Sequence, residues 1–195
     1  MPDRNSDGRL LQRASGGDQS AFLELYERHR QPIFRFAYRL LGSVEMAEDI
    51  THDCFLGLIR KPENFDSTRA SLRTYMYAAA RNLAMKQFRS AGRESPLDDL
   101  SDDPLVPERE APLRRLLSEE LSAIVKEAVQ NLPPLQREAL ILFEYEGLSL
   151  NEIAGVVGSD VGAVKARLHR GRERLRNALL PYLNSSQEIV TLKEA

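Results

Sequence analysis

Apolar residues recur at helical spacing along most of the chain, and polar or proline-containing segments interrupt the pattern. In the first half, Phe22, Leu25, Ile33, Phe36 and Leu40 mark one apolar stripe. Helices are predicted at about 18–41, 44–60 and 69–88, then at about 113–131, 134–146, 149–157 and 160–181. The pattern therefore predicts an all-α protein.

The predicted helices form two groups, because the composition changes between them. From Glu94 to about Pro112, four prolines alternate with seven acidic residues and few apolar ones, which is typical of an extended, semi-stiff linker. We therefore predict a disordered N-terminus (1–17), a helical domain (18–92), the linker (93–112), a four-helix domain (113–181) and a short tail (182–195).

Two prolines should interrupt helices, because proline lacks a backbone N–H and clashes with the preceding turn. Pro32 falls inside the first predicted helix and should kink it or split it. Pro181 should end the last one.

The stretch from Ser149 to Arg176 predicts a helix-turn-helix. Ser149 and Glu152 have the spacing of a capping box, which satisfies the first N–H groups of a helix. Gly158 can adopt the left-handed conformation that ends this short helix, and Ser159 or Asp160 can cap the longer helix that follows.

The longer helix has one apolar face and one basic face. Projected at about 100° per residue, its apolar stripe consists of Val161, Val164, Leu168, Gly171 and Leu175. The opposite side has small residues at its centre and long cations along both edges, with six Lys or Arg against one Glu between positions 161 and 176. Small side chains admit the backbone close to base edges and flanking cations can reach phosphates, so the pattern favours duplex DNA binding over a merely solvated surface.

A second basic stretch lies before the linker. From Arg60 to Arg93 there are eight Lys or Arg against two acidic residues. Aromatic residues are interleaved with these cations, namely Phe65, Tyr75, Tyr77 and Phe88. Rings that stack on bases beside cations that follow the backbone suit single-stranded nucleic acid, although helical aromatics can equally belong to a core.

Composition narrows the remaining possibilities. The formal net charge of the 195 residues is −2, so nucleic-acid affinity must come from local patches. Cys54 is the one cysteine, which excludes an intramolecular disulfide and a cysteine-built zinc site and is expected to be a buried hydrophobe. No signal peptide or membrane-spanning run is evident, so we expect a cytoplasmic protein without membrane insertion.

Catalytic motifs are not apparent either. The sequence shows no phosphate-binding glycine loop, nucleophile elbow or paired-histidine motif, and His29, His52 and His169 are scattered. We therefore expect no enzymatic activity, no catalytic residue, no metal and no cofactor.

Several stretches, taken together, resemble the sigma factors of bacterial RNA polymerase, and specifically the compact extracytoplasmic-function (ECF) group. The stretches are AEDITHDCFL (47–56), SLRTYMYAAARN (71–82), LPPLQREAL (132–140), and GLSLNEIA (147–154) followed by VKARLHRGR (164–172). They occur in the order found in that family, on both sides of a variable linker. The resemblance implies a subunit that recognises promoters rather than one that catalyses a reaction.

The resemblance also implies three sets of contact residues. The face of the second predicted helix that would bind core RNA polymerase carries Asp49, His52, Asp53 and Leu56. The residues that would hold the melted non-template strand of the −10 element are Phe65, Arg73, Tyr75, Tyr77, Arg81, Asn82, Lys86 and Arg89. The residues that would contact the −35 duplex are Ala163, Lys165, Ala166, Arg167, His169, Arg170 and Arg174.

Some positions depart from the family pattern. Tyr75 stands where a tryptophan is frequent and Ala78 where an arginine is frequent, which should alter strand opening or base preference. Ala163 and Ala166 replace hydroxyl residues of the recognition helix, so base reading should shift to Lys165 and Arg170.

The family further implies two features outside the DNA contacts. The acidic linker would lie near the nucleic-acid channels of the polymerase, and an anti-sigma factor is a usual partner. Two alternatives remain on the sequence alone. One is a stand-alone helix-turn-helix regulator, which usually dimerises on two half-sites; the other is a sigma-like decoy that titrates a regulatory partner.

Overall fold

The computed structural model describes the backbone of residues 4–90 and 122–191, and the side chains of residues 6–88 and 122–182. All regular elements within these ranges are helices. The predicted all-α class, with two helical regions separated by a linker segment, is confirmed. The linker itself (93–112) and the start of the next predicted helix (113–121) lie outside the described residues.

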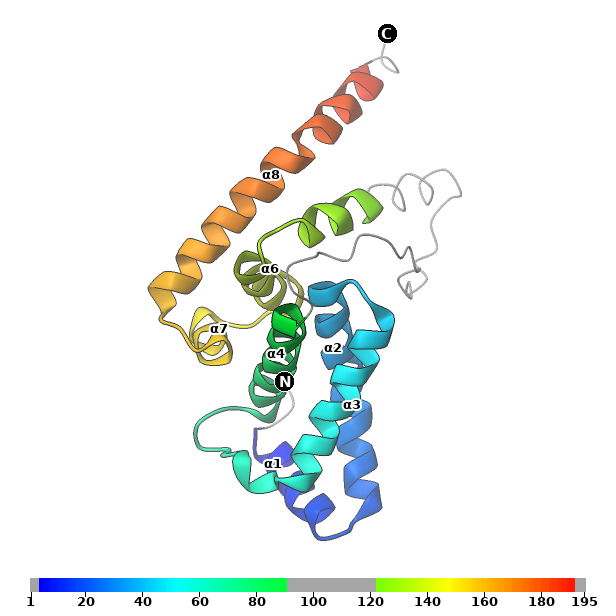
Figure 1. Cartoon of the computed structure of the whole chain (residues 1–195), viewed down its shortest axis with the longest axis vertical. Helices are drawn as coiled ribbons and strands as arrows, with labels where there is room; N and C mark the ends of the chain where they lie inside the picture. Colours follow the sequence, from blue (N-terminus) through cyan, green and yellow to red (C-terminus); the bar gives the residue numbers. More distant parts are fainter. Residues whose placement is uncertain (1–3, 91–121, 192–195) are drawn as a thin grey trace.

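The N-terminal region is a bundle in which helix α2 packs on three other helices (Figure 1). Its elements are α1 (Arg4–Ser15), α2 (Gln19–Leu41), α3 (Val44–Arg60), the short 3₁₀ helix η1 (Pro62–Asn64) and α4 (Leu72–Ser90). Asp18 caps α2, and Gly42 ends it in a left-handed conformation with φ of 78°. Ser43 then caps α3, so each predicted boundary here has a local chemical cause.

The predicted disorder of residues 1–17 is wrong, because residues 4–15 form α1. Leu10 and Leu11 are buried against the bundle. Asp7 is also buried; its carboxylate lies 3.0 Å from His29 Nε2 and pairs with Arg28. Burial raises the pKa of Asp7, but hydrogen bonds and charges from His29 and Arg28 outweigh that effect and lower it. A polar segment is thus ordered by one specific ionic contact and a narrow apolar stripe.

The helices that contain Pro32 and Pro181 continue past them, so the predicted split of the first helix and the predicted end of the last one are wrong. Helix α2 runs through Pro32 without splitting, since the buried residues on both sides of it, Leu25 and Ile33 among them, hold the helix in place. Helix α8 (Val161–Thr191) likewise continues past Pro181. A proline removes one hydrogen bond, and extending an existing helix is far easier than nucleating one.

The C-terminal region consists of four helical segments. Residues 122–130 form the first. The others are α6 (Pro134–Leu140), continued by a π-helical turn η2 (Ile141–Tyr145), then α7 (Leu150–Val157) and α8. Pro134 occupies the first turn of α6 as predicted, where its missing N–H costs nothing.

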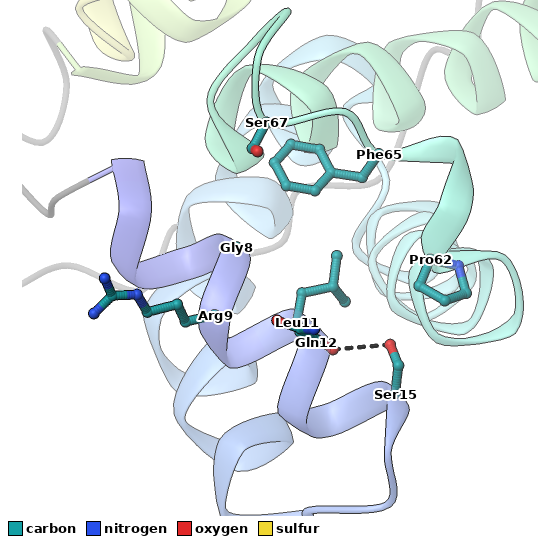
Figure 2. Close-up of a pocket in the computed structure, with 8 residues that line it drawn as sticks. All are labelled: Gly8, Arg9, Leu11, Gln12, Ser15, Pro62, Phe65 and Ser67. Atoms are coloured by element: carbon teal, nitrogen blue, oxygen red, sulfur yellow. Dashed lines mark hydrogen bonds between the residues drawn. The ribbon is translucent and has the colours of Figure 1, made fainter.

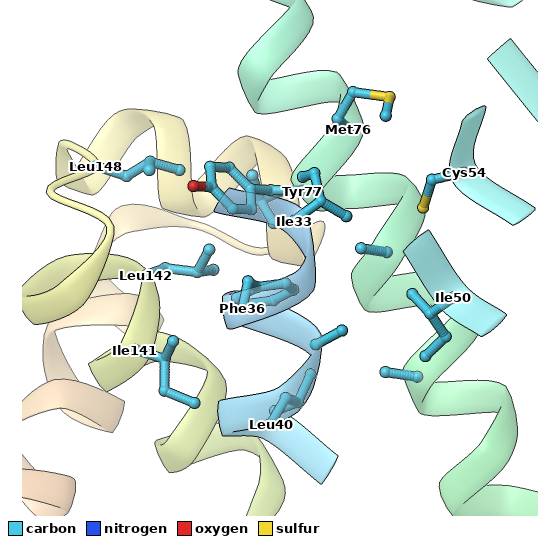
Figure 3. Packing of buried hydrophobic residues seen from close by; sticks show 14 of the residues in the cluster. Ile33, Phe36, Leu40, Ile50, Cys54, Met76, Tyr77, Ile141, Leu142 and Leu148 are labelled. Atoms are coloured by element: carbon cyan, nitrogen blue, oxygen red, sulfur yellow. The ribbon is translucent and has the colours of Figure 1, made fainter. Parts of the chain in front are cut away.

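The two regions share one hydrophobic core, which the linker pattern did not predict. Helix α4 packs on α7, and α2 packs on α6 and η2. Phe36 of α2 points toward Leu142 of η2, and Tyr77 of α4 points toward Leu148, which follows η2 (Figure 3). The side chains of Phe36, Tyr77 and Leu142 are fully buried, so the described conformation is closed across the region boundary.

Candidate nucleic-acid interface

Helices α7 and α8 form the predicted helix-turn-helix. The capping box is present, because the Ser149 hydroxyl accepts from Glu152 N while the Glu152 carboxylate accepts from Ser149 N at 2.9 Å. Gly158 ends α7 with φ of 62°. Of the two possible caps for α8, Asp160 is the one used, and it accepts from Ala163 N at 2.9 Å. This backbone hydrogen bond lowers the pKa of Asp160.

The faces of α8 are those that the periodicity predicts. Val164, Leu168 and Gly171 are buried, and Gly171 faces Gln136 of α6. Of the predicted −35 contacts, four are exposed and three are half-buried. The exposed ones are Lys165, His169, Arg170 and Arg174, and the half-buried ones are Ala163, Ala166 and Arg167.

Arg167 differs from the other predicted −35 cations because it turns inward. Its Nη1 lies 3.5 Å from the carboxylate of Glu138, whose side chain is completely buried. Of the predicted −35 cations, Lys165, Arg170 and Arg174 therefore remain exposed in this conformation, with His169 beside them.

The predicted strand-binding residues of α4 are also divided. Arg73, Asn82 and Lys86 are exposed. Tyr75 is half-buried, with its ring edge-to-face against Phe65 at a centroid distance of 5.5 Å. The side chain of Arg89 lies outside the described residues.

Tyr77 was predicted to bind the strand, but the structure places it in the core. Its side chain is fully buried, its ring packs edge-on against Phe36 at 5.3 Å, and its hydroxyl donates to Glu146. Burial, followed by the charge of Glu146, raises the pKa of Tyr77. In this conformation the ring is inaccessible to a base and belongs to the core.

An open cavity of about 630 Å³ lies between α1 and the segment after η1 (Figure 2). Its lining residues are Gly8, Arg9, Leu11, Gln12, Ser15, Pro62, Phe65 and Ser67. Gly8 lies on the side of α1 that faces Ser67, where an added Cβ would be in ordinary van der Waals contact at 3.8 Å from Ser67 Cβ. The cavity thus offers one aromatic face, Phe65, together with polar side chains from α1.

The predicted polymerase-binding residues share the outer face of α3. Asp49, His52 and Asp53 are exposed and Leu56 is half-buried. Cys54, on the other side of the helix, is buried as predicted, and burial followed by the charge of Asp53 raises the pKa of its thiol to about 12. A thiol so rarely ionised is a packing residue and not a reactive one.

The polar residues that join the two regions were missed at the level of sequence. Glu138 pairs with Arg81 Nε at 2.9 Å, and Glu146 pairs with Arg39 at 3.6 Å. The burial of Glu138 could have been predicted, because this residue falls on the same helical face as Leu135, Ala139 and Leu142. The burial of Glu146 could not have been predicted in this way, because its partners are remote in the chain.

Comparisons with known proteins agree with this arrangement. Residues 25–94 match the family Sigma-70 region 2, and residues 122–175 match Sigma-70 region 4. The chain is 31% identical to the RNA polymerase sigma-H factor of Pseudomonas aeruginosa, over 95% of this chain and all of that one. It is also 31% identical to the ECF RNA polymerase sigma factor SigW of Bacillus subtilis, over 87% of this chain and 94% of that one.

Solved structures show the same fold. The sigma factor RpoE of Bartonella quintana, crystallised with the anti-sigma factor NepR, superposes with a TM-score of 0.66 and 25% identity. The match covers 81% of this chain and 96% of that one. CnrH, solved with the cytosolic domain of CnrY, superposes with a TM-score of 0.65 over 91% of this chain and 98% of that one, at 24% identity.

A bundle that matches region 2, followed by a helix-turn-helix domain that matches region 4, defines a promoter-specificity subunit of RNA polymerase. The chain belongs to the sigma-70 family, within the group of ECF sigma factors. Members of this family are not enzymes. In the described parts of the chain, no helix combines the length and the apolar character needed to cross a bilayer.

Proposed function

We propose that this sigma factor binds the −35 element through α8, the melted −10 strand through α4 and the segment before it, and core polymerase through α3. The observation that carries the proposal is the exposed basic face of α8 within a helix-turn-helix whose two helices are both capped at their N-termini. The acidic sequence between the regions would lie near the nucleic-acid channels of the polymerase. Tethering two modest contacts to one polymerase raises their effective concentration at one promoter.

In the duplex contact, different side chains of α8 are suited to reading bases and to binding phosphates. Lys165 and Arg170 are exposed near the small residues Ala163 and Ala166, where the backbone can approach base edges. Arginine can make a bidentate contact with guanine O6 and N7. Arg174 is a turn further along the helix and is suited to a phosphate, which positions the protein without reading sequence.

The strand contact would use the cavity between α1 and the segment after η1. A base lifted from its stack needs a pocket and an aromatic face, and Phe65 supplies that face at the cavity wall. Arg73, Asn82 and Lys86 are exposed on α4 and could follow the backbone of the same strand. Tyr75, which packs on Phe65, would support the ring rather than stack on the base.

The polymerase contact would use the exposed face of α3. Asp49, His52 and Asp53 are solvent-accessible on a helix whose other face is anchored by Ile50 and Leu58. Polar side chains on a rigid helix suit a specific protein interface whose charges set orientation. An anti-sigma factor is proposed as a second partner, because RpoE of Bartonella quintana, which shares the fold, was solved in complex with NepR.

Reconstitution tests the proposal. The purified chain, mixed with core RNA polymerase that lacks any specificity subunit, should co-elute with it and direct new transcription start sites on a pool of genomic promoters. A stand-alone regulator would bind duplex DNA without polymerase and would produce no new start sites, so the two classes give opposite results.

The base-reading contact gives a quantitative prediction. Arg170→Ala should weaken promoter-duplex binding by about 1–3 kcal/mol and relax preference at one base position. Arg174→Ala should instead weaken binding to all sequences alike and reduce the slope of log affinity against log salt by about one. Binding of labelled duplexes at several salt concentrations measures both effects, with Arg35→Ala on the exposed surface of α2 as the control.

The opposite pattern for Arg170 would reassign it. If Arg170→Ala leaves base discrimination intact while the salt dependence falls, this side chain contacts a phosphate, and Lys165 is the remaining candidate for base reading.

A further inference from the structure

Helix α1 forms one wall of the cavity that the proposed function assigns to an unpaired base. Among the lining residues, Gly8, Leu11, Gln12 and Ser15 share one face of α1, because residues three and four apart in a helix are neighbours. Figure 2 shows the side chain of Leu11 pointing toward the ring of Phe65 on the opposite wall. The shape of the cavity therefore depends on how firmly α1 lies against the bundle.

The apolar anchoring of α1 is narrow. The buried apolar side chains of this helix are Leu10, Leu11 and Ala14, and the helix has 12 residues. A helix of this length is marginal in isolation and depends on its packing. The turns before Leu10 need another contact to stay against the bundle.

That contact is a buried polar cluster around Asp7. Asp7 is 5% exposed and His29 of α2 is 4% exposed. The Oδ2 atom of Asp7 lies 3.0 Å from His29 Nε2, and Oδ1 accepts from Arg28 Nη1. Arg28 also donates to Ser6 Oγ at 3.1 Å and to Glu24 at 2.6 Å. The first turns of α1 are thus tied to α2 by charged groups.

We propose that Asp7 is a positioning residue for the −10 strand, because its contacts with Arg28 and His29 hold α1 as a fixed wall for a base inserted between Leu11 and Phe65. The inference rests on the proposed strand contact. It adds to that contact a helix that precedes the matched Sigma-70 region 2, residues 25–94. Asp7 is too buried to touch the strand, so it acts through α1. A wall that is already ordered lowers the cost of binding the base.

Arg9 has a different part in the same site. It lines the cavity and is exposed, and Figure 2 shows its guanidinium group extending away from Phe65. A cation at the rim of a base pocket can contact a phosphate of the strand, which adds affinity without reading a base. Substitutions of Arg9 and of Asp7 therefore separate the phosphate contact from the position of the wall.

The test measures how much one base contributes to binding in each variant. The full chain is assembled with core polymerase and bound to a labelled promoter fork, which is duplex upstream and single-stranded in the −10 non-template strand. An abasic site replaces each −10 nucleotide in turn, and anisotropy gives the affinity. The abasic penalty, which is the fold loss of affinity when the base is removed, reports the base contact alone because the phosphates remain.

The wild type should show an abasic penalty of about tenfold at one −10 position, since stacking of a single base contributes strongly to single-strand affinity. Asp7→Ala should reduce that penalty to below about threefold, because the two losses act through one contact. The matched control is Glu27→Ala, which removes a carboxylate at an exposed position of α2 beside Arg28 and should keep the full penalty. Arg9→Ala should also keep it, while the slope of log affinity against log salt falls by about 0.7.

Arg28→Ala guards against misfolding of the Asp7 variant. It removes the same ion pair from α2, at a side chain that keeps 25% of its surface exposed. It should reduce the abasic penalty in the same direction, and Asp7→Ala/Arg28→Ala should lose no more than Asp7→Ala. Co-elution with core polymerase and binding of a duplex that carries only the −35 element should match wild type in every variant, which a general loss of folding would not allow.

The outcomes distinguish the positioning role from the proposed function. If the wild type shows an abasic penalty and both Asp7→Ala and Arg28→Ala keep it in full, the positioning role is wrong and the proposed strand contact stands. If Asp7→Ala weakens polymerase and −35 duplex binding as much as strand binding, Asp7 serves general stability and the positioning role is again wrong. If the wild type shows no abasic penalty at any −10 position, the proposed strand contact fails and the positioning role fails with it.

Discussion

Replacing Arg137 with alanine should lower the free energy of unfolding by about 3–5 kcal/mol. Arg137 is 6% exposed, and its guanidinium donates to Leu40 O at 2.7 Å and Leu132 O at 3.0 Å, and also to Gln130. Removing it leaves these buried acceptors without a donor, which costs far more than the loss of a solvated bond. Urea denaturation followed by circular dichroism measures the change.

The charge of Arg137 should persist across the pH range of such an experiment. Burial lowers the pKa of its guanidinium to about 10, so the group remains protonated near neutrality. Because the folded-state and unfolded-state pKa values both lie well above neutrality, the group is protonated in both states and its contribution to stability does not change with pH near neutrality. Arg174→Ala, at an exposed position of α8, is the control and should change stability by less than about 0.5 kcal/mol. A loss below about 1 kcal/mol for Arg137→Ala would show that water replaces its bonds.

Arg137 also takes part in the contact by which the C-terminal region caps a helix of the N-terminal region. The last carbonyls of α2 have no partner within that helix. Gln130 Nε2 donates to Arg39 O at 2.7 Å and Arg137 Nη1 donates to Leu40 O, so side chains of the C-terminal region cap an N-terminal helix. Gly42, whose φ of 78° favours glycine, lies beside this contact, and an added Cβ there would be 3.4 Å from Gln130 Oε1.

Features with a local cause were predictable from the sequence. The capping box of Ser149 and Glu152 and the left-handed Gly158 depend on neighbours within a few residues, and both are present. The buried and exposed faces of α8 follow from the helical period alone, as the burial of Val164 and Leu168 shows.

Features with a remote cause were not predictable in the same way. Helix α1 is ordered by Asp7 contacting His29 and Arg28, about one helix further along the chain. The inward turn of Arg167 depends on Glu138, and the burial of Tyr77 depends on Glu146. The periodicity of a single helix identifies an apolar face but not the element that covers it. The packing of the two regions against each other could therefore not be predicted from the periodicity of their helices.

Phe36→Ala should destabilise both regions together, by about 3–5 kcal/mol. Phe36 is fully buried in α2, yet it points toward Leu142 of the C-terminal region as well as toward Tyr77 (Figure 3). If the core is shared, the cavity left by the ring weakens the packing on both sides of the boundary. Hydrogen–deuterium exchange should therefore accelerate in α2 and α4 and also in α6 and α7.

Phe22→Ala is the matched control for this prediction. Phe22 lies on the same helix, but its ring packs on Tyr26 and Phe55, at centroid distances of 6.1 and 6.4 Å, within the N-terminal region. Its removal should accelerate exchange in α2 and α3 and leave α7 close to wild type. If Phe36→Ala also leaves α6 and α7 unchanged, the two regions unfold independently, and the closed arrangement depends on its polar contacts rather than on a common core.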